Sequence, residues 1–182
     1  MAIRKVARMG HPVLRAQARE LSKKEILSVE TRELVRDLIE TMAEYRGIGI
    51  AAPQIHESVA VAIIDYPEEQ GLTVIINPKI TVLDETEKGN WEGCLSVPEI
   101  RGLVYRPQKI RVDYLDLKAE PQHIIAEGFA ATVYQHELDH LFGVLFVDRV
   151  RYEPGKSPIA FTEEYHRFLV PQDEDDVGEL AD

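Results

Sequence analysis

The sequence has little of what marks a secreted, membrane or nucleic-acid-binding protein. A single cysteine, Cys94, among 182 residues excludes an intramolecular disulfide framework and fits a reducing compartment. No apolar run approaches the roughly 18 residues of a membrane span, and no apolar stretch follows the basic N-terminus. Basic residues are also scarce: 21 Lys and Arg against 32 Asp and Glu leave a net charge of −11. We therefore expect a soluble cytoplasmic protein with no membrane partner and no nucleic-acid specificity.

The length and the apolar pattern predict one α+β domain. We expect this domain over residues 1–170, followed by an acidic, disordered tail over residues 171–182. Ser22 and Glu25 form a capping-box pattern before apolar residues at helical spacing, which predicts one long amphipathic helix ending at Gly47. Strand patterns then occupy residues 59–64, 72–80, 80–89, 109–117 and 122–129. The order predicts largely antiparallel β-sheets around a central helix, with the amphipathic helix N-terminal to them.

The central helix carries the sequence HELDH. Apolar residues recur at helical spacing from Phe129 onward, so we expect this helix to face the core. His136 and His140 stand four positions apart and therefore project from one stripe, about 6 Å apart at their Cβ atoms. Glu137 follows the first histidine, where its carboxylate can approach a water molecule on a shared metal ion. The pattern predicts a metal site.

A third ligand is needed, because catalytic sites of this type use three protein ligands and keep one position open. Cys94 lies in the glycine-punctuated stretch WEGCLSVPEIRG. A lone cysteine is often only a small buried hydrophobic residue, but this thiolate would complete a set with the two imidazoles. A soft thiolate favours Fe²⁺, Zn²⁺, Ni²⁺ or Co²⁺ over Mg²⁺ or Ca²⁺.

Three stretches occur together in the chain: GIGIAAPQ (47–54), EGCLS (92–96) and QHELDH (135–140). In this combination the sequence resembles the peptide deformylase family, over essentially residues 1–150. HELDH alone also fits metalloproteases, whereas the three stretches together are far more specific. The resemblance implies one divalent metal ion, with Fe²⁺ as the native ion. The ligands that it implies are Cys94, His136 and His140.

The resemblance also implies the reaction, which is removal of the N-formyl group from the N-terminal formylmethionine of nascent polypeptides with release of formate. It implies that Glu137 acts as general base and acid. The side-chain amide of Gln54 and the backbone N–H of Leu95 would stabilise the oxyanion. A turn-capping amide after Pro53 is the competing interpretation of Gln54.

Further residues are implied to bind the peptide. The apolar walls of a methionine pocket would be Ile48, Phe129 and Val133. The backbones around Ile48, Gly49 and Gly93 would pair with the peptide as an added strand. Arg101 would contact the peptide farther along; a solvated surface arginine is the equal alternative. Asp139 lies off the ligand stripe and is expected either to pair with a cation such as Arg106 or to be an ordinary surface carboxylate.

The chain departs from the family pattern after about residue 150. Many family members end in a basic helix that meets the ribosome, whereas prolines interrupt this segment and its end is acidic. The sequence therefore argues against docking on the ribosome through the C-terminus and leaves a transient ribosome contact open. A bacterial, phage or organellar source is compatible with this end.

Two rival functions stand beside deformylation. A cysteine ligand in place of a downstream histidine or glutamate disfavours an endopeptidase. A structural metal module or peptide-binding protein leaves Glu137 and Gln54 without a task, since a closed structural site would need a fourth protein ligand.

Overall fold

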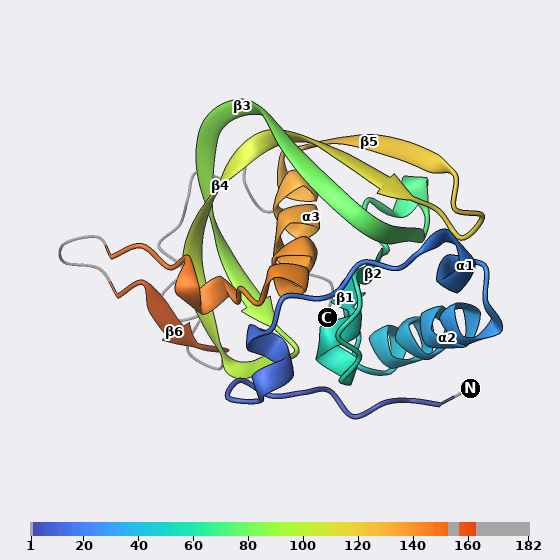
Figure 1. Ribbon diagram of the computed structural model, residues 1–182. Helices are drawn as coiled ribbons and strands as arrows, with labels where there is room; N and C mark the ends of the chain where they lie inside the picture. Colours follow the sequence, from blue (N-terminus) through green and yellow to red (C-terminus); the bar gives the residue numbers. More distant parts are fainter. Residues whose placement is uncertain (1, 153–156, 163–182) are drawn as a thin grey trace.

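The computed structural model describes residues 2–152 and 157–162 (Figure 1). Within them a six-stranded sheet runs in the order β1-β2-β3-β4-β5, with β6 added to β4, and every pairing is antiparallel. The strands are β1 (Gly49–Ala51), β2 (Val61–Ile64), β3 (Thr73–Cys94), β4 (Val97–Leu115), β5 (Pro121–Glu127) and β6 (Ile159–Phe161). The helices are α1 (Lys23–Ile26), α2 (Val29–Glu44) and α3 (Phe129–Asp139), with short 3-10 turns between elements. The expected boundary at residue 170 and the tail over residues 171–182 lie outside the described residues.

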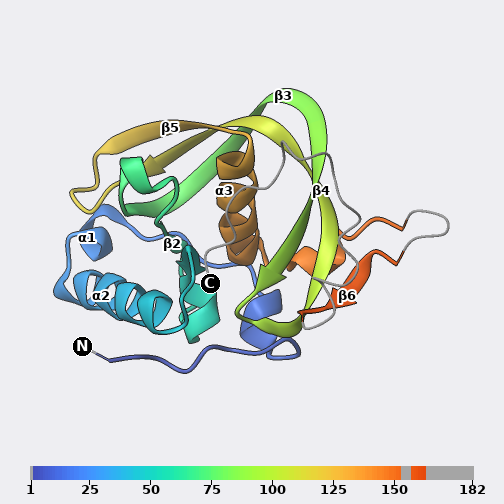
Figure 2. The same cartoon turned by 180° about the vertical axis from the view of Figure 1, so that it is seen from behind.

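The α+β class with a largely antiparallel sheet is confirmed. The long strands β3 and β4 arch around α3 (Figures 1 and 2). Tyr134 and Leu138 of α3 are fully buried, in one cluster with Ile110 and Val112 of β4. Each side chain of this size contributes roughly 1.5–3 kcal/mol when buried. The helix that carries HELDH is therefore held on the concave side of the sheet by its apolar residues.

The predicted division between strands over residues 72–80 and 80–89 is wrong, because β3 continues through both. Its pairing with β4 shifts register between Ile76 and Lys79 and again after Val82. Asn77 takes a positive φ of 50° just before Pro78. Asn77 and Pro78 therefore form an irregularity within β3 and do not end the strand. This irregularity also bends the strand around α3.

The expected single helix from Ser22 to Gly47 is also wrong. Ser22 caps α1 through the N–H of Glu25, as its capping box predicts, but α1 ends at Ile26. Ser28 then takes an extended conformation and caps α2 by accepting from the N–H of Thr31. A second capping serine outweighs the continuous apolar pattern, because its side chain offers the backbone a local partner that restarts the helix.

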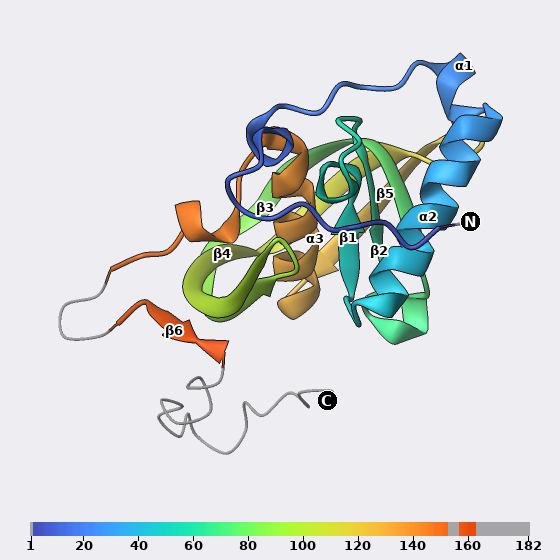
Figure 3. The ribbon, with the colours of Figure 1, turned by 90° about the horizontal axis from the view of Figure 1, so that it is seen from below.

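Backbone hydrogen bonds join the N-terminal segment to the turn after β1 and to the turn after β3. The N–H of Ala7 donates to the carbonyl of Gln54 at 2.7 Å, and the N–H of Met9 donates to the carbonyl of Ser96 at 2.8 Å. In Figure 3, which views the molecule from below, this segment passes in front of β1. Among the described helices, none combines the length and the apolar character needed to cross a membrane.

Candidate metal centre

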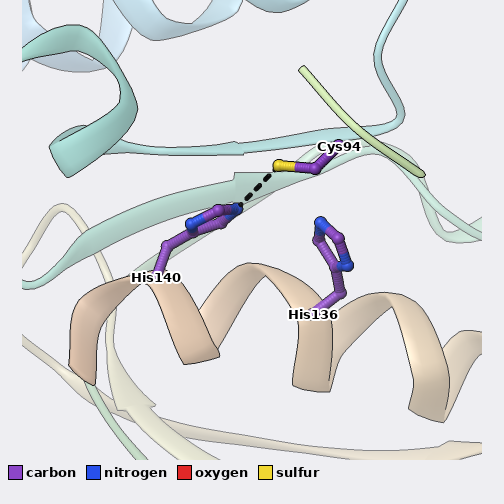
Figure 4. A group of neighbouring side chains, drawn as sticks. All are labelled: Cys94, His136 and His140. Atoms are coloured by element: carbon purple, nitrogen blue, oxygen red, sulfur yellow. Dashed lines mark hydrogen bonds between the residues drawn. The ribbon is translucent and has the colours of Figure 1, made fainter. Parts of the chain in front are cut away.

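Three elements bring the predicted ligands together. His136 lies in the last turn of α3, and His140 begins the 3-10 helix His140–Phe142, which ends at Gly143 with a φ of 72°. Cys94 is the last residue of β3 and faces the two histidines (Figure 4). Its Sγ lies 3.3 Å from Nε2 of His140. The ligand atoms of the three residues all lie within 4.8 Å of one another, so this cluster could hold a metal ion.

The electrostatics of the cluster suit a cation. Burial raises the pKa of the Cys94 thiol, but the charge of His140 and hydrogen bonds from both histidines outweigh burial and hold the pKa well below its usual range. Burial lowers the pKa of His136, and hydrogen bonds with Cys94 and Glu92 outweigh it and raise that pKa well above its usual value. A partly buried thiolate therefore lies next to two imidazoles. A thiolate with two imidazoles is a donor set for a transition metal.

Glu137 lies beside the cluster with an unsatisfied oxygen. The residue is 6% exposed, and its Oε2 is buried without a hydrogen-bond partner among the described residues. Burial raises the pKa of Glu137, although the charges of His136 and His140 oppose this. A carboxyl group with a raised pKa and an open oxygen suits the exchange of a proton with a bound molecule.

Gly49 allows Glu137 to take this position. A Cβ atom built on Gly49 would lie 2.6 Å from Cγ and 2.8 Å from Oε1 of Glu137. Atoms do not approach so closely, so any larger residue at this point of β1 would displace the carboxylate. The sequence predicted a backbone contact between Gly49 and a peptide; the steric contact with Glu137 was not predicted.

Gln54 presents its amide nitrogen to the cluster. Its Oε1 accepts from the N–H of Ala51 at 2.8 Å, which fixes the orientation of the amide. Its Nε2 lies 3.3 Å from Oγ of Ser96 and 3.6 Å from Sγ of Cys94. The turn-capping role and a donor role are therefore compatible, because they use opposite ends of one buried side chain.

A buried charge network supports His136 from behind. Nδ1 of His136 lies 2.8 Å from Oε2 of Glu92, which leaves Nε2 of the imidazole for a ligand. Arg106, 2% exposed, donates from Nε and Nη2 to Glu92 and from Nη1 to Asp139. Burial raises the pKa of Glu92, but Arg106 and His136 outweigh burial and lower it to about 2. Arg149 completes the network through two 2.6 Å hydrogen bonds to Asp139.

The expected pairing of Asp139 with Arg106 is confirmed. The role of Glu92 was missed, although a signal was present. Residues two apart in a regular strand share a face, which would have predicted that Glu92 projects toward the histidine helix with Cys94; in the structure both do so despite a register shift between them.

A cavity of about 360 Å³ opens in front of the cluster. Its lining includes Gln54, Leu95, Cys94, His136 and Glu137, together with the predicted peptide-contacting residues Ile48, Gly49, Gly93, Arg101, Phe129 and Val133. Of the predicted site residues only His140 does not line the cavity; it is 1% exposed. Phe129, which the resemblance implied as a wall of the methionine pocket, is 47% exposed at the cavity and makes a T-shaped contact with Tyr66, so the core-facing stripe of the helix does not include it.

Comparison with known proteins identifies the family. The family model described as polypeptide deformylase matches residues 3–154. The peptide deformylase of Leptospira biflexa serovar Patoc (strain Patoc 1) is 43% identical over 160 residues, which cover 83% of this chain and 89% of the relative. Peptide deformylase 2 of Nostoc sp. (strain PCC 7120) is 41% identical over 173 residues, 91% of this chain and 93% of the relative.

Solved structures agree. The peptide deformylase of Thermotoga maritima has a TM-score of 0.78 at 36% identity and covers 84% of this chain and 100% of its own. The class I type b peptide deformylase of Acinetobacter baumannii bound to Met-Ala-Ser has a TM-score of 0.78 at 38% identity, with 82% and 99% covered. The matched region contains the three candidate ligands Cys94, His136 and His140. The chain belongs to the peptide deformylase family.

Proposed function

We propose that this enzyme removes the N-formyl group from the N-terminal formylmethionine of nascent polypeptides and releases formate. The proposal rests on the arrangement of side chains at the buried end of the cavity, which we call its closed end. There a cysteine and two histidines converge, an unpartnered oxygen of Glu137 lies beside them, and the amide of Gln54 points toward the same place. This combination fits hydrolysis of a small amide better than structural binding of a metal.

Cys94, His136 and His140 would hold one divalent ion, with Fe²⁺ as the native ion and Zn²⁺, Ni²⁺ or Co²⁺ as substitutes. The fit rests on the donor set and on the lowered pKa of the partly buried Cys94 thiol, which favours a bound cation. When bound, such an ion supplies Lewis acidity, which makes water a usable nucleophile near neutral pH. Glu92 and Arg106 would keep His136 oriented for this task.

Glu137 would move the proton. Water adds to the formyl carbon, and the carboxylate accepts one proton from it. As the bond between the formyl carbon and the methionine nitrogen breaks, the same carboxyl group delivers that proton to the nitrogen. The products are formate and a free amine, and Glu137 returns to its starting state. Its raised pKa and its buried, unpartnered oxygen support both transfers.

Two donors would stabilise the charge that develops on the formyl oxygen. Nε2 of Gln54 is held toward the cluster by the hydrogen bond from Ala51 to its Oε1. The backbone N–H of Leu95, in the turn directly after Cys94, would be the second donor. Gln54 does not titrate, so it can donate at any pH; one donor of this kind contributes about 10²–10³-fold to kcat.

The peptide would bind in extended form between β1 and the end of β3. Among the described strands β1 pairs only with β2, so its other edge faces the cavity near Ile48 and Gly49. Gly93 lines the opposite side, and a peptide between these edges would add a strand. The methionine side chain would contact Ile48, Phe129 and Val133. The Met-Ala-Ser bound to the Acinetobacter baumannii relative belongs to the class of peptide that deformylation releases.

We propose that the enzyme acts on nascent chains in the cytoplasm. We propose that any contact with the ribosome is transient and does not involve the C-terminus, because the last residues carry six carboxylates and no cation in PQDEDDVGELAD.

The test is formate release from formyl-Met-Ala by protein purified without oxygen and loaded with Fe²⁺. Formate should appear with the wild type and be absent with Cys94→Ala. If the wild type binds the ion but releases no formate, deformylation is the wrong reaction. Assay of an internal peptide bond in acetyl-Ala-Met-Ala-Ser-amide then separates deformylation from endopeptidase activity.

A further inference from the structure

The short strand β6 lies outside residues 3–154, the part of the chain that the family model matches. It pairs with β4 in antiparallel register, with Arg101 opposite Ala160 and Gly102 opposite Ile159. The N–H of Leu103 donates to the carbonyl of Pro158 at 2.9 Å. The hairpin of β3 and β4 that bears Cys94 therefore gains a third strand, seen beside β4 in Figures 1 and 3.

The register shows which face of β6 meets the cavity. A Cβ atom on Gly102 would lie 2.5 Å from Val150, so this face of β4 packs against the segment after α3. Ile159 shares that face, because paired residues in neighbouring strands project to the same side. Arg101 and Ala160 share the opposite face.

Arg101 connects this second face to the peptide site. A Cβ atom on Gly93 would meet the guanidinium and Cγ of Arg101 at 3.5–3.6 Å, so the arginine lies over the backbone that borders the cleft. Thr162, directly after β6, is exposed and lines the same cavity as Gly93, Cys94 and Glu137. The residue that directly follows β6 thus contributes to the wall of the cavity in front of Cys94 and His136.

We propose that the chain at the end of β6 extends the peptide cleft and that Thr162, which lines the same cavity as Arg101, contacts the fourth residue of the substrate. The inference rests on the proposed function. β4 separates β6 from β3, and neighbouring strands lie about 4.8 Å apart, so a peptide that leaves the edge of β3 and crosses β4 would need about three extended residues to span the roughly 10 Å to β6. A peptide with its formyl group at the cluster therefore reaches β6 only after its third residue. Formyl-Met-Ala is too short to do so.

Charge at residue 162 provides the test. Thr162→Glu and Thr162→Lys are compared with Ile159→Glu, which places the same charge three residues earlier, at a position of β6 that does not line the cavity. The substrates are formyl-Met-Ala-Ser-Lys-Ala and formyl-Met-Ala-Ser-Glu-Ala, and the readout is the ratio of their kcat/KM values. Any general loss of activity or of folded protein cancels in this ratio.

Thr162→Glu should raise the ratio of the lysine peptide to the glutamate peptide by about 3-fold, and Thr162→Lys should lower it by about the same factor, as for exposed ion pairs. Ile159→Glu should leave the ratio unchanged. A ratio that does not respond to either change at Thr162 overturns the inference. An equal shift in Ile159→Glu also overturns it, because the effect would then come from net charge and not from contact. If the wild type fails on formyl-Met-Ala itself, the proposed function has failed, and the inference falls with it.

Discussion

The two ends of the cavity are built differently. At the closed end, Glu137 and Glu92 are each 6% exposed, and Arg106 holds Glu92 against a histidine of the cluster. At the open end, Ile48 is 44% and Phe129 is 47% exposed, and Thr162 is exposed as well. The contrast suits an enzyme that performs one reaction on many nascent sequences. The reacting groups need fixed positions, whereas the walls that meet variable side chains need only the right shape and polarity.

The free-energy cost of removing an ion-pair partner also differs between the two ends. Removing one partner of a buried ion pair costs about 3–5 kcal/mol, because the other charge stays buried without compensation. An exposed ion pair contributes about 0–1 kcal/mol. Substitutions at the closed end should therefore change catalysis or metal binding strongly, and substitutions at the open end should change KM slightly.

The largest effect should come from Glu137→Gln. The amide keeps the shape of the side chain but cannot carry the proton, so kcat should fall by about 10³-fold. Metal content by atomic emission should stay at the wild-type level, because Glu137 is not among the three proposed ligands. A near-normal kcat would show that another group transfers the proton.

Glu92→Gln should weaken metal binding by about 10- to 100-fold, because His136 loses the charged partner of its Nδ1 and Arg106 keeps only Asp139. Competition with a chromophoric chelator measures the change. Glu87→Gln is the matched control, since Glu87 also lies on β3 and also pairs with an arginine, Arg151, at the surface. Equal losses in the two variants would contradict the positioning role of Glu92.

Gly49→Ala should lower kcat by about 10-fold, since the new methyl group would meet Glu137 and displace its carboxylate by a fraction of an ångström. The double variant Gly49→Ala/Glu137→Asp provides the control. The shorter carboxylate leaves room for the methyl group, so the two losses in kcat should be less than additive. Full additivity would show that Gly49 acts independently of Glu137.

The smallest effect is expected at the open end. Arg101→Ala should raise KM for formyl-Met-Ala-Ser by about 2- to 3-fold and leave kcat unchanged, as for a partly solvated contact. Steady-state kinetics separates the two constants. A loss of kcat comparable to that of Gly49→Ala would remove the distinction between the two ends.

The sequence predicted the closed end better than the fold around it. His136, Glu137 and His140 follow one helix period, and Cys94 lies within a short motif, so local spacing indicates their chemistry. The close approach of Gly49 to Glu137 joins β1 to α3, and no local pattern reports it. The second cap at Ser28 and the bulge at Asn77 were missed because the apolar periodicity runs through both.

The open end was the least predictable. Prolines in the C-terminal segment indicated only that a long helix was excluded. The strand β6 forms by pairing with Ile100, Arg101 and Gly102 of β4, a partner that lies about sixty residues earlier in the chain. Such long-range pairing depends on the free edge of β4. A strand of three residues is too short to show a strand pattern in the sequence.

X-ray absorption at the iron edge of the reconstituted, oxygen-free enzyme tests the central claim most directly, because it reports which atoms bind the ion. The account predicts a sulfur ligand in the wild type that disappears in Cys94→Ala together with formate release. An iron site without sulfur in a wild-type enzyme that still deformylates formyl-Met-Ala would contradict the assignment of Cys94, His136 and His140 as the catalytic metal centre.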